Sequence, residues 1–246
     1  MIDSTIVRLT MRQVLGQKRT ILMLAFALLP VLLAALYAIE NDTSEAQQWT
    51  ATTAMGDLVI GLVLPFAALI FGTAALGQEF EDGTAVYLLA KPISRTTIVY
   101  SKLVVAWIAT AVVVVMSLVP TGLIGLAGVP QDNLVVGFVV GGILGSLAYS
   151  AAFLWLSIVT SRALIAGLLY VFIWEGVVVN LFTGVKFLSV GEYSLGIAKG
   201  LSTAPDSSFD PRLSFTPAAV ATALVIVVAI WFAIRALRRW QIGEST

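Results

Sequence analysis

The chain has 246 residues, of which 59% are hydrophobic and only 11% are charged, and its mean hydropathy is +0.98. Soluble domains are closer to half apolar and a quarter charged, so this composition indicates a membrane protein. The net charge is zero, which argues against a nucleic-acid partner, and the absence of Cys and His excludes disulfides, thiolate chemistry, zinc-protease sites and Ser-His hydrolase sites.

Residues 1–20 are predicted to form an amphipathic helix on the cytoplasmic surface of the membrane. Apolar side chains recur there at helical spacing, at Val7, Met11, Val14 and Leu15. Basic side chains occupy the neighbouring strip, at Arg8, Arg12 and Arg19. A helix of this kind lies in the headgroup layer with its apolar face toward the acyl chains. The alternative is a basic flank that only sets the orientation of the chain.

Residues 21–246 are predicted to form an all-α, polytopic membrane domain of six transmembrane helices. A spanning helix needs about 20 mostly apolar residues. Six stretches come close to this requirement: Ile21–Ile39, Val59–Leu76, Val104–Leu126, Val135–Thr160, Ala163–Thr183 and Pro217–Ile234. The second of them could begin earlier, near Thr53. Lipid offers the backbone no hydrogen bonds, so a helical bundle is expected rather than an open sheet.

The distribution of basic residues predicts that both termini lie in the cytoplasm. Eleven basic residues fall on one side of the predicted spans: Arg8, Arg12, Lys18, Arg19, Lys91, Arg95, Lys102, Arg162, Arg235, Arg238 and Arg239. Three fall on the other side, all in the external loop 184–216: Lys186, Lys199 and Arg212. Short cytoplasmic flanks carry the excess of Lys and Arg. We therefore expect a multi-pass protein of the cell membrane.

The fourth predicted span has a face of small residues. Gly137, Gly141 and Gly145 recur at a spacing of four residues. Such a face allows another helix to approach closely. The partner helix can belong to the same chain or to a second copy.

The cytoplasmic loop 77–102 contains acids on the side where basic residues are expected. Glu79, Glu81 and Asp82 precede Gly83-Thr84, and a short helix that starts there would end at Pro92. A second short helix is predicted from Ser94, a suitable N-cap, through Lys102.

This loop carries a pattern that resembles a known family. The pattern is E-F-E-D-G-T-x-x-x-L-L-x-K-P-I-S-R-x-x-x-x-x-S-K over residues 79–102, between the second and third of six spans. It is similar to the permease subunits of type 2 (ABC-2) ABC transporters, and the layout of the spans is similar over nearly the whole chain. The resemblance implies that the loop docks on an ATP-binding subunit. The residues implied in this coupling are Glu79, Phe80, Glu81, Asp82, Gly83, Thr84, Lys91 and Arg95. The alternative is a solvated loop whose acids contact only water, Lys91 or Arg95.

The resemblance also implies that energy comes from outside this chain. No G-x-x-x-x-G-K-[ST] phosphate-binding motif occurs in the sequence. We therefore expect no cofactor and no catalytic residue here, with ATP and Mg bound by a separate ABC-type ATP-binding subunit. A second permease copy, identical or paralogous, would complete a two-fold assembly.

Glu175 is the only charged residue inside the predicted spans. Acids at this depth are costly and are by default candidates for a substrate path. The alternative is a structural acid that joins two helices by a hydrogen bond. The candidate hydroxyl partners are Ser117, Thr121 and Tyr149.

The external loop 184–216 divides into two parts. Residues Val185–Ile197 are expected to form a re-entrant or interfacial helix pair, and residues Ser202–Arg212 a loop. The loop can serve as a lid or as a simple tether.

The function expected from the sequence is that of the membrane subunit of an ATP-driven exporter. The alternative is a stand-alone secondary transporter or channel, for which a single intramembrane Glu without repeated halves is poor support. An intramembrane enzyme would need a constellation of reactive groups that the sequence lacks.

Overall fold

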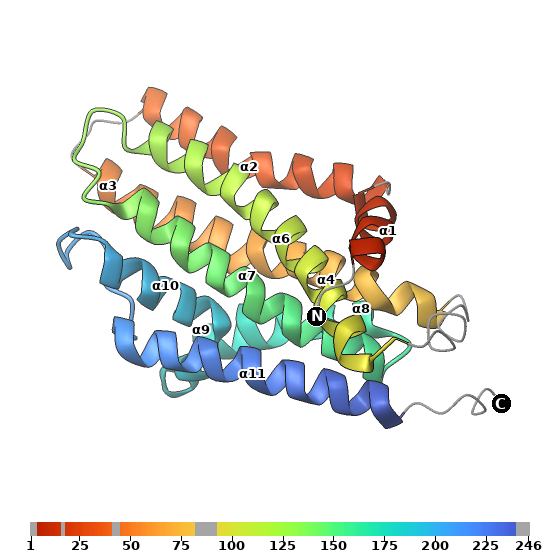
Figure 1. Cartoon of the computed structure of the whole chain (residues 1–246). Coiled ribbons are helices and arrows are strands. Elements are labelled where there is room, and N and C mark those ends of the chain that lie inside the picture. Colours follow the sequence, from red (N-terminus) through yellow and green to blue (C-terminus); the bar gives the residue numbers. More distant parts are fainter. Residues whose placement is uncertain (1–3, 16–17, 41–44, 82–92, 240–246) are drawn as a thin grey trace.

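The computed structural model describes residues 4–15, 18–40, 45–81 and 93–239. Within these ranges the regular secondary structure is all helical, with no strand, and most of the long helices run side by side (Figure 1). The predicted all-α class is confirmed.

Five helical stretches within the described ranges are long and apolar enough to cross a membrane: Thr20–Ile39, Ala46–Gly77, Arg95–Gly125, Leu134–Val159 and Phe215–Arg239. They belong to α2 (Lys18–Glu40), α3 (Ala46–Trp49) with η1 (Thr50–Val63) and α4 (Leu64–Glu81), α6 (Arg95–Gly125), α7 (Leu134–Val159) and α11 (Phe215–Arg239). All five were predicted from hydropathy.

The second stretch begins earlier than predicted. It starts at Ala46 rather than at Val59, and the helix continues without a break through η1 into α4. Two threonines of this region fit within the helix because their hydroxyl groups donate hydrogen bonds to backbone carbonyls, one in a neighbouring helix and one in the same segment. Thr50 donates to the Gly125 carbonyl (3.0 Å), and Thr52 donates to the Gln48 carbonyl (2.7 Å).

The fifth predicted span, 163–183, is a helix in three parts: α8 (Ala163–Leu169), η2 (Tyr170–Val178) and α9 (Val179–Leu181). Its apolar part, Ala163–Val178, is shorter than the other five. Its middle part, η2, is a π-helix, and so is η1. π-helices are rare and frequently occur at functional sites, because they shift side chains out of the α-helical register.

The predicted external loop contains a short 3₁₀ helix, η3 (Thr183–Leu188), followed by α10 (Val190–Leu201). α10 lies against α7 and α11 (Figure 1). Its buried side chains include Tyr193, Ile197 and Ala198. Residues 202–214 form an irregular connection to α11.

The N-terminal segment forms α1 (Ser4–Leu15), which packs against α6 and α4. Ile6 and Thr10, one turn apart, are buried, whereas Arg8 is exposed. The helix thus has one face toward the bundle.

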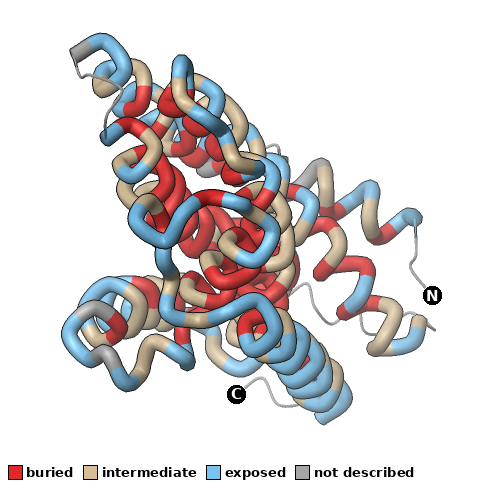
Figure 2. The backbone as a smooth tube through the Cα atoms, turned by 90° about the vertical axis from the view of Figure 1, so that its left-hand side faces the viewer, coloured by how far each residue is buried: buried red, intermediate tan, exposed pale blue. Residues whose placement is uncertain are grey.

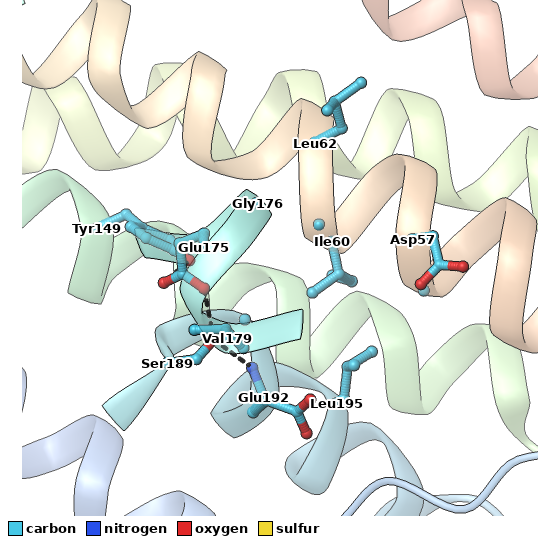
Figure 3. Close-up of a pocket in the computed structure, with 13 residues that line it drawn as sticks. Asp57, Ile60, Leu62, Tyr149, Glu175, Gly176, Val179, Ser189, Glu192 and Leu195 are labelled. Atoms are coloured by element: carbon cyan, nitrogen blue, oxygen red, sulfur yellow. Dashed lines mark hydrogen bonds between the residues drawn. The ribbon is translucent and has the colours of Figure 1, made fainter. Parts of the chain in front are cut away.

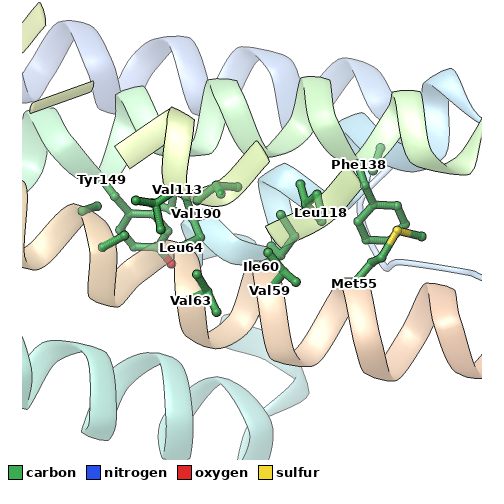
Figure 4. Packing of buried hydrophobic residues seen from close by; sticks show 14 of the residues in the cluster. Met55, Val59, Ile60, Val63, Leu64, Val113, Leu118, Phe138, Tyr149 and Val190 are labelled. Atoms are coloured by element: carbon green, nitrogen blue, oxygen red, sulfur yellow. The ribbon is translucent and has the colours of Figure 1, made fainter. Parts of the chain in front are cut away.

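The core is centred on α7, which packs against α4, α6, α10 and α11. Met55 and Val59 from η1 pack in one buried cluster with Leu118 from α6 and Phe138 from α7 (Figure 4). The outer helices α2 and α11 are exposed along most of their length, and the long exposed helix leading to the C-terminus is clear in Figure 2. Their exposed apolar side chains fit a lipid environment.

We call the end of the bundle where α4 ends and α6 begins the basal end. The opposite end, where α6 ends at Gly125 and α7 begins at Leu134, is the distal end. Gln47 joins three segments there: its side-chain nitrogen donates to the Asp132 carboxylate (2.7 Å), and its side-chain oxygen accepts from the Ser208 hydroxyl (2.8 Å).

Candidate functional site

A polar cavity of about 390 Å³ lies between the two π-helices and α10 (Figure 3). Three carboxylates line it: Asp57 from η1, Glu175 from η2 and Glu192 from α10. Tyr149 of α7 closes one side, and small residues such as Gly56 leave room. No basic residue is among those that line this cavity.

Glu175 is held by hydroxyl groups from three different elements. Its Oε1 accepts hydrogen bonds from Tyr149 (2.7 Å) and Tyr170 (3.1 Å), and its Oε2 accepts one from Ser189 (2.5 Å). These hydrogen bonds satisfy the carboxylate oxygens and offset the cost of burying them. Glu175 therefore connects η2 with α7 and with the start of α10.

Tyr149 was among the three partners considered for Glu175, but the other two lie elsewhere. The Ser117 hydroxyl donates to the Ala27 carbonyl (2.7 Å), between α6 and α2. The Thr121 hydroxyl is buried and does not line the cavity.

Ser189 has two roles at the start of α10. Its hydroxyl donates to Glu175 and also caps the helix by accepting a hydrogen bond from the Glu192 backbone nitrogen (3.2 Å). Such a cap satisfies a backbone donor that the helix itself leaves free. Through this one hydroxyl, the position of η2 is linked to the N-terminus of α10.

Two further contacts fix the segment before α10. Lys186 pairs with Glu192 (3.3 Å), and the Tyr193 hydroxyl donates to the Phe187 carbonyl (2.6 Å). Burial raises the pKa of the Tyr193 phenol, and the negative charge of Glu175 raises it further, so Tyr193 stays a neutral donor.

A second cavity of about 300 Å³ continues from the first toward the distal end. The two share Gly56, Asp57, Glu192 and Leu195 in their walls. The second adds charged side chains of both signs: Lys186, Asp210 and Arg212. Together they form a polar vestibule that extends from Glu175 toward the distal loops.

The predicted small-residue face of α7 packs against α10 of the same chain. A side chain at Gly137 would meet the Ala198 carbonyl, and one at Gly141 or Gly145 would meet Ser194. The helices approach so closely because these three positions have no side chain. The glycines thus allow α10 to lie directly against α7.

At the basal end, an ion pair joins the two ends of the loop 77–102. The Lys102 ammonium donates to the Glu79 carboxylate (2.5 Å), and the Lys102 side chain is only 2% exposed. Lys102 was not among the partners considered from the sequence for the acids of this loop.

The predicted second short helix of this loop is instead the first part of α6. The Ser94 hydroxyl accepts a hydrogen bond from the Thr97 backbone nitrogen (3.2 Å), so the N-cap is where it was predicted. The helix does not end near Lys102, however, because it continues through a mostly apolar run up to Gly125. Of the predicted coupling residues, Phe80 and Glu81 lie in the last turn of α4 and Arg95 starts α6, while Asp82, Gly83, Thr84 and Lys91 lie outside the described residues.

Several residues of the site were missed by sequence reasoning, and one of them had a visible signal. Tyr170 precedes Glu175 by five residues, which brings the two side chains together in a π-helix but not in an α-helix. The partners considered from the sequence, Ser117, Thr121 and Tyr149, all lie on other predicted spans. Asp57 was missed because it was assigned to an external loop.

Within the described ranges, no group of three or more Asp or Glu side chains is arranged to hold a metal ion. The carboxylates of the cavity are instead separated around its wall.

Comparison with known proteins identifies the family. Residues 17–190 match the family described as ABC-2 family transporter protein, so the match includes both π-helices and the loop 77–102. The chain is also similar to an uncharacterized protein of Mycoplasma pneumoniae, with 26% identity over 204 residues. That alignment covers 76% of this chain but only 26% of the relative, so the chain spans about a quarter of that protein's length. The chain therefore belongs to the ABC-2 family of transporter proteins, as a multi-pass membrane component.

Proposed function

We propose that the chain is the permease subunit of an ATP-driven exporter in the cell membrane. Membership of the ABC-2 family carries this proposal. In the proposed arrangement the helix Ala163–Leu181 is a sixth crossing, the basal end faces the cytoplasm with both termini, and α1 lies in the headgroup layer. The excess of basic residues in the basal flanks supports this orientation.

The proposed partner is a separate ABC-type ATP-binding subunit that docks on the loop 77–102. The ion pair between Glu79 and Lys102 supports this role because it ties α4 to α6 at the point where the loop leaves the bundle. A push on the loop would then move both helices together. Two permeases and two ATP-binding subunits would form the complete transporter.

The proposed exit path is the distal vestibule beside α10. Differential affinity of ATP for two arrangements of the assembly is what would drive the change between them. The hydrogen bonds of Glu175 support a coupled movement of η2 and α10, because one hydroxyl, that of Ser189, serves both.

Co-purification tests the proposal. An affinity-tagged chain extracted from its native membrane is expected to bring down an ATP-binding subunit in equal amount, and substitution of Gly83 by a bulky residue is expected to weaken the complex. A Ser207→Cys change in the distal loop is the control and should leave the complex intact. Recovery of a chain that transports cargo alone would contradict the proposal and favour a secondary transporter.

A further inference from the structure

An apolar groove of about 580 Å³ lies on the membrane-facing side of the bundle between α2, α4 and η2. Its walls are formed by apolar side chains alone: Leu22, Met23, Ala25, Phe26, Leu62, Phe66, Ile70 and Phe172. Three aromatic rings form its centre. Phe66 makes edge-to-face contacts with Phe26 (5.9 Å between ring centroids) and with Phe172 (5.4 Å).

The groove meets the polar cavity at η1. Leu62 lines both of them, and Figure 3 shows its side chain extending from η1 to the side away from Ile60. On η2, Phe172 of the groove precedes Glu175 of the cavity by three residues. The apolar groove and the polar cavity therefore adjoin each other along η1 and η2, and we call the two together the track.

The two parts differ sharply in charge. Among the described residues, no charged side chain lines the groove, whereas Asp57, Glu175 and Glu192 line the cavity. The cavity is thus lined by three carboxylates, whereas Lys186, which pairs with Glu192 at 3.3 Å, lines only the adjoining second cavity. A ligand that matches both parts has an alkyl tail and a cationic headgroup.

We propose that this track binds a single-chain cationic amphiphile, with its tail among Phe26, Phe66 and Phe172 and its headgroup facing Asp57 and Glu175. The groove lies toward the basal half, because Leu22 and Phe26 are near the start of α2, and the vestibule opens toward the distal end. The amphiphile thus enters sideways from the bilayer and leaves headgroup first. The statement that the amphiphile is transported rests on the proposed function, whereas the statement that it binds here does not.

The test is photolabelling of the full-length chain in lipid nanodiscs with a dodecyltrimethylammonium that carries a diazirine at the end of its tail. Labels mapped by mass spectrometry are expected on α2, α4 and η2 near the three phenylalanines. Unlabelled dodecyltrimethylammonium below its micellar concentration is expected to compete about tenfold better than dodecyl sulfate, which has the same tail and the opposite charge.

Two pairs of variants separate the two parts of the site. Asp57→Asn is expected to remove the preference for the cationic competitor, and Phe66→Ala is expected to weaken labelling about tenfold. The matched controls lie outside the track: Asp206→Asn, whose side chain is 82% exposed, and Phe232→Ala on α11. Both controls should bind as the unmodified chain does.

Equal competition by the two surfactants would overturn the headgroup assignment. Two results would overturn the groove as the tail site. One is labelling spread equally over α2 and α11. The other is no labelling in the groove, because phospholipid or a second copy of the chain fills it. The assay contains no ATP-binding subunit, so failure of the proposed coupling leaves its result unchanged. Binding without transport would contradict the proposed function alone.

Discussion

The Tyr149 hydroxyl lies 2.7 Å from the Glu175 carboxylate and joins the central helix α7 to the π-helix η2. The only charged residue inside the predicted spans is thus part of a hydrogen-bonded junction and also part of a cavity wall. The structural and the functional interpretation of Glu175 are compatible, because the same carboxylate serves both.

Removal of this hydrogen bond is expected to destabilise the bundle modestly. Tyr149→Phe leaves Glu175 with one donor fewer, and hydrogen bonds between membrane helices contribute about 0.6–2 kcal/mol. Thermal unfolding in detergent, with Tyr100→Phe as a control at a half-exposed tyrosine, measures the change. In a double-mutant cycle, Tyr149→Phe and Glu175→Gln should be less than additive; full additivity would show that the two groups act independently.

Loss of the basal ion pair is expected to cost more. Lys102→Met leaves Glu79 without its ammonium partner in a largely buried position, for which about 3 kcal/mol is typical. Asp206→Asn removes the partner of Lys199 at a side chain that is 82% exposed, and should cost no more than about 1 kcal/mol. Denaturation in detergent compares the two; similar losses would mean that the Glu79–Lys102 pair is not a structural tie.

The glycines of α7 are expected to tolerate no side chain. Gly141→Ala places a methyl group against the backbone of α10 at Ser194, and overpacking of this kind costs about 1–3 kcal/mol. Gly61→Ala is the control, because its added methyl group would lie 3.6 Å from the Gly56 carbonyl oxygen, an ordinary contact. The control should be neutral or slightly stabilising by about 0.5 kcal/mol. Equal behaviour of both variants would mean that α7 and α10 separate easily.

The membrane orientation is testable because the chain has no cysteine. Ser161→Cys lies between α7 and α8 at the basal end, and Ser207→Cys lies in the distal loop; both positions are exposed. In intact cells a membrane-impermeant maleimide should label only Ser207→Cys, and Ser161→Cys should react after permeabilisation. The reverse pattern would place the loop 77–102 outside the cell.

The five long helices were predictable because hydropathy reports length and apolar content directly. α6, α7 and α11 start and end within a few residues of apolar runs, apart from the polar first turns of α6 and the basic last turn of α11. The N-cap at Ser94 was predictable as well, because a local hydrogen bond to Thr97 requires only local sequence.

The π-helices were not predictable, and the main errors follow from them. An apolar run of this length has the same hydropathy in an α-helix and in a π-helix, so hydropathy did not distinguish η2. The five-residue spacing of Tyr170 and Glu175 is visible in the sequence, but it has a meaning only once the π-helix is known. In η1, polar residues suggested a loop. In the structure, however, the Thr50 hydroxyl donates a hydrogen bond to the backbone of α6, and Asp57 lines a cavity. Both signals depend on a neighbouring helix that the sequence does not place.

The buried Lys102 illustrates the same limit at the basal end. From its position in the sequence, Lys102 is one more basic residue beside a spanning helix. Only the fold brings it next to Glu79, which lies 23 residues earlier in the sequence. The pairing of α7 with α10 was half predictable: the glycine spacing indicated a close helix partner, and the chain topology decided which one.

Site-specific crosslinking tests coupling through residues 77–102 most directly. A photoreactive maleimide on Thr84→Cys, in native membranes, should form a covalent adduct with an ATP-binding subunit, and ATP should change its yield because the subunits move between two states. The same reagent on Ser207→Cys should give no such adduct. An ATP-binding subunit that crosslinks at Ser207→Cys and not at Thr84→Cys, or a purified chain that moves cargo without any ATPase, would contradict the account.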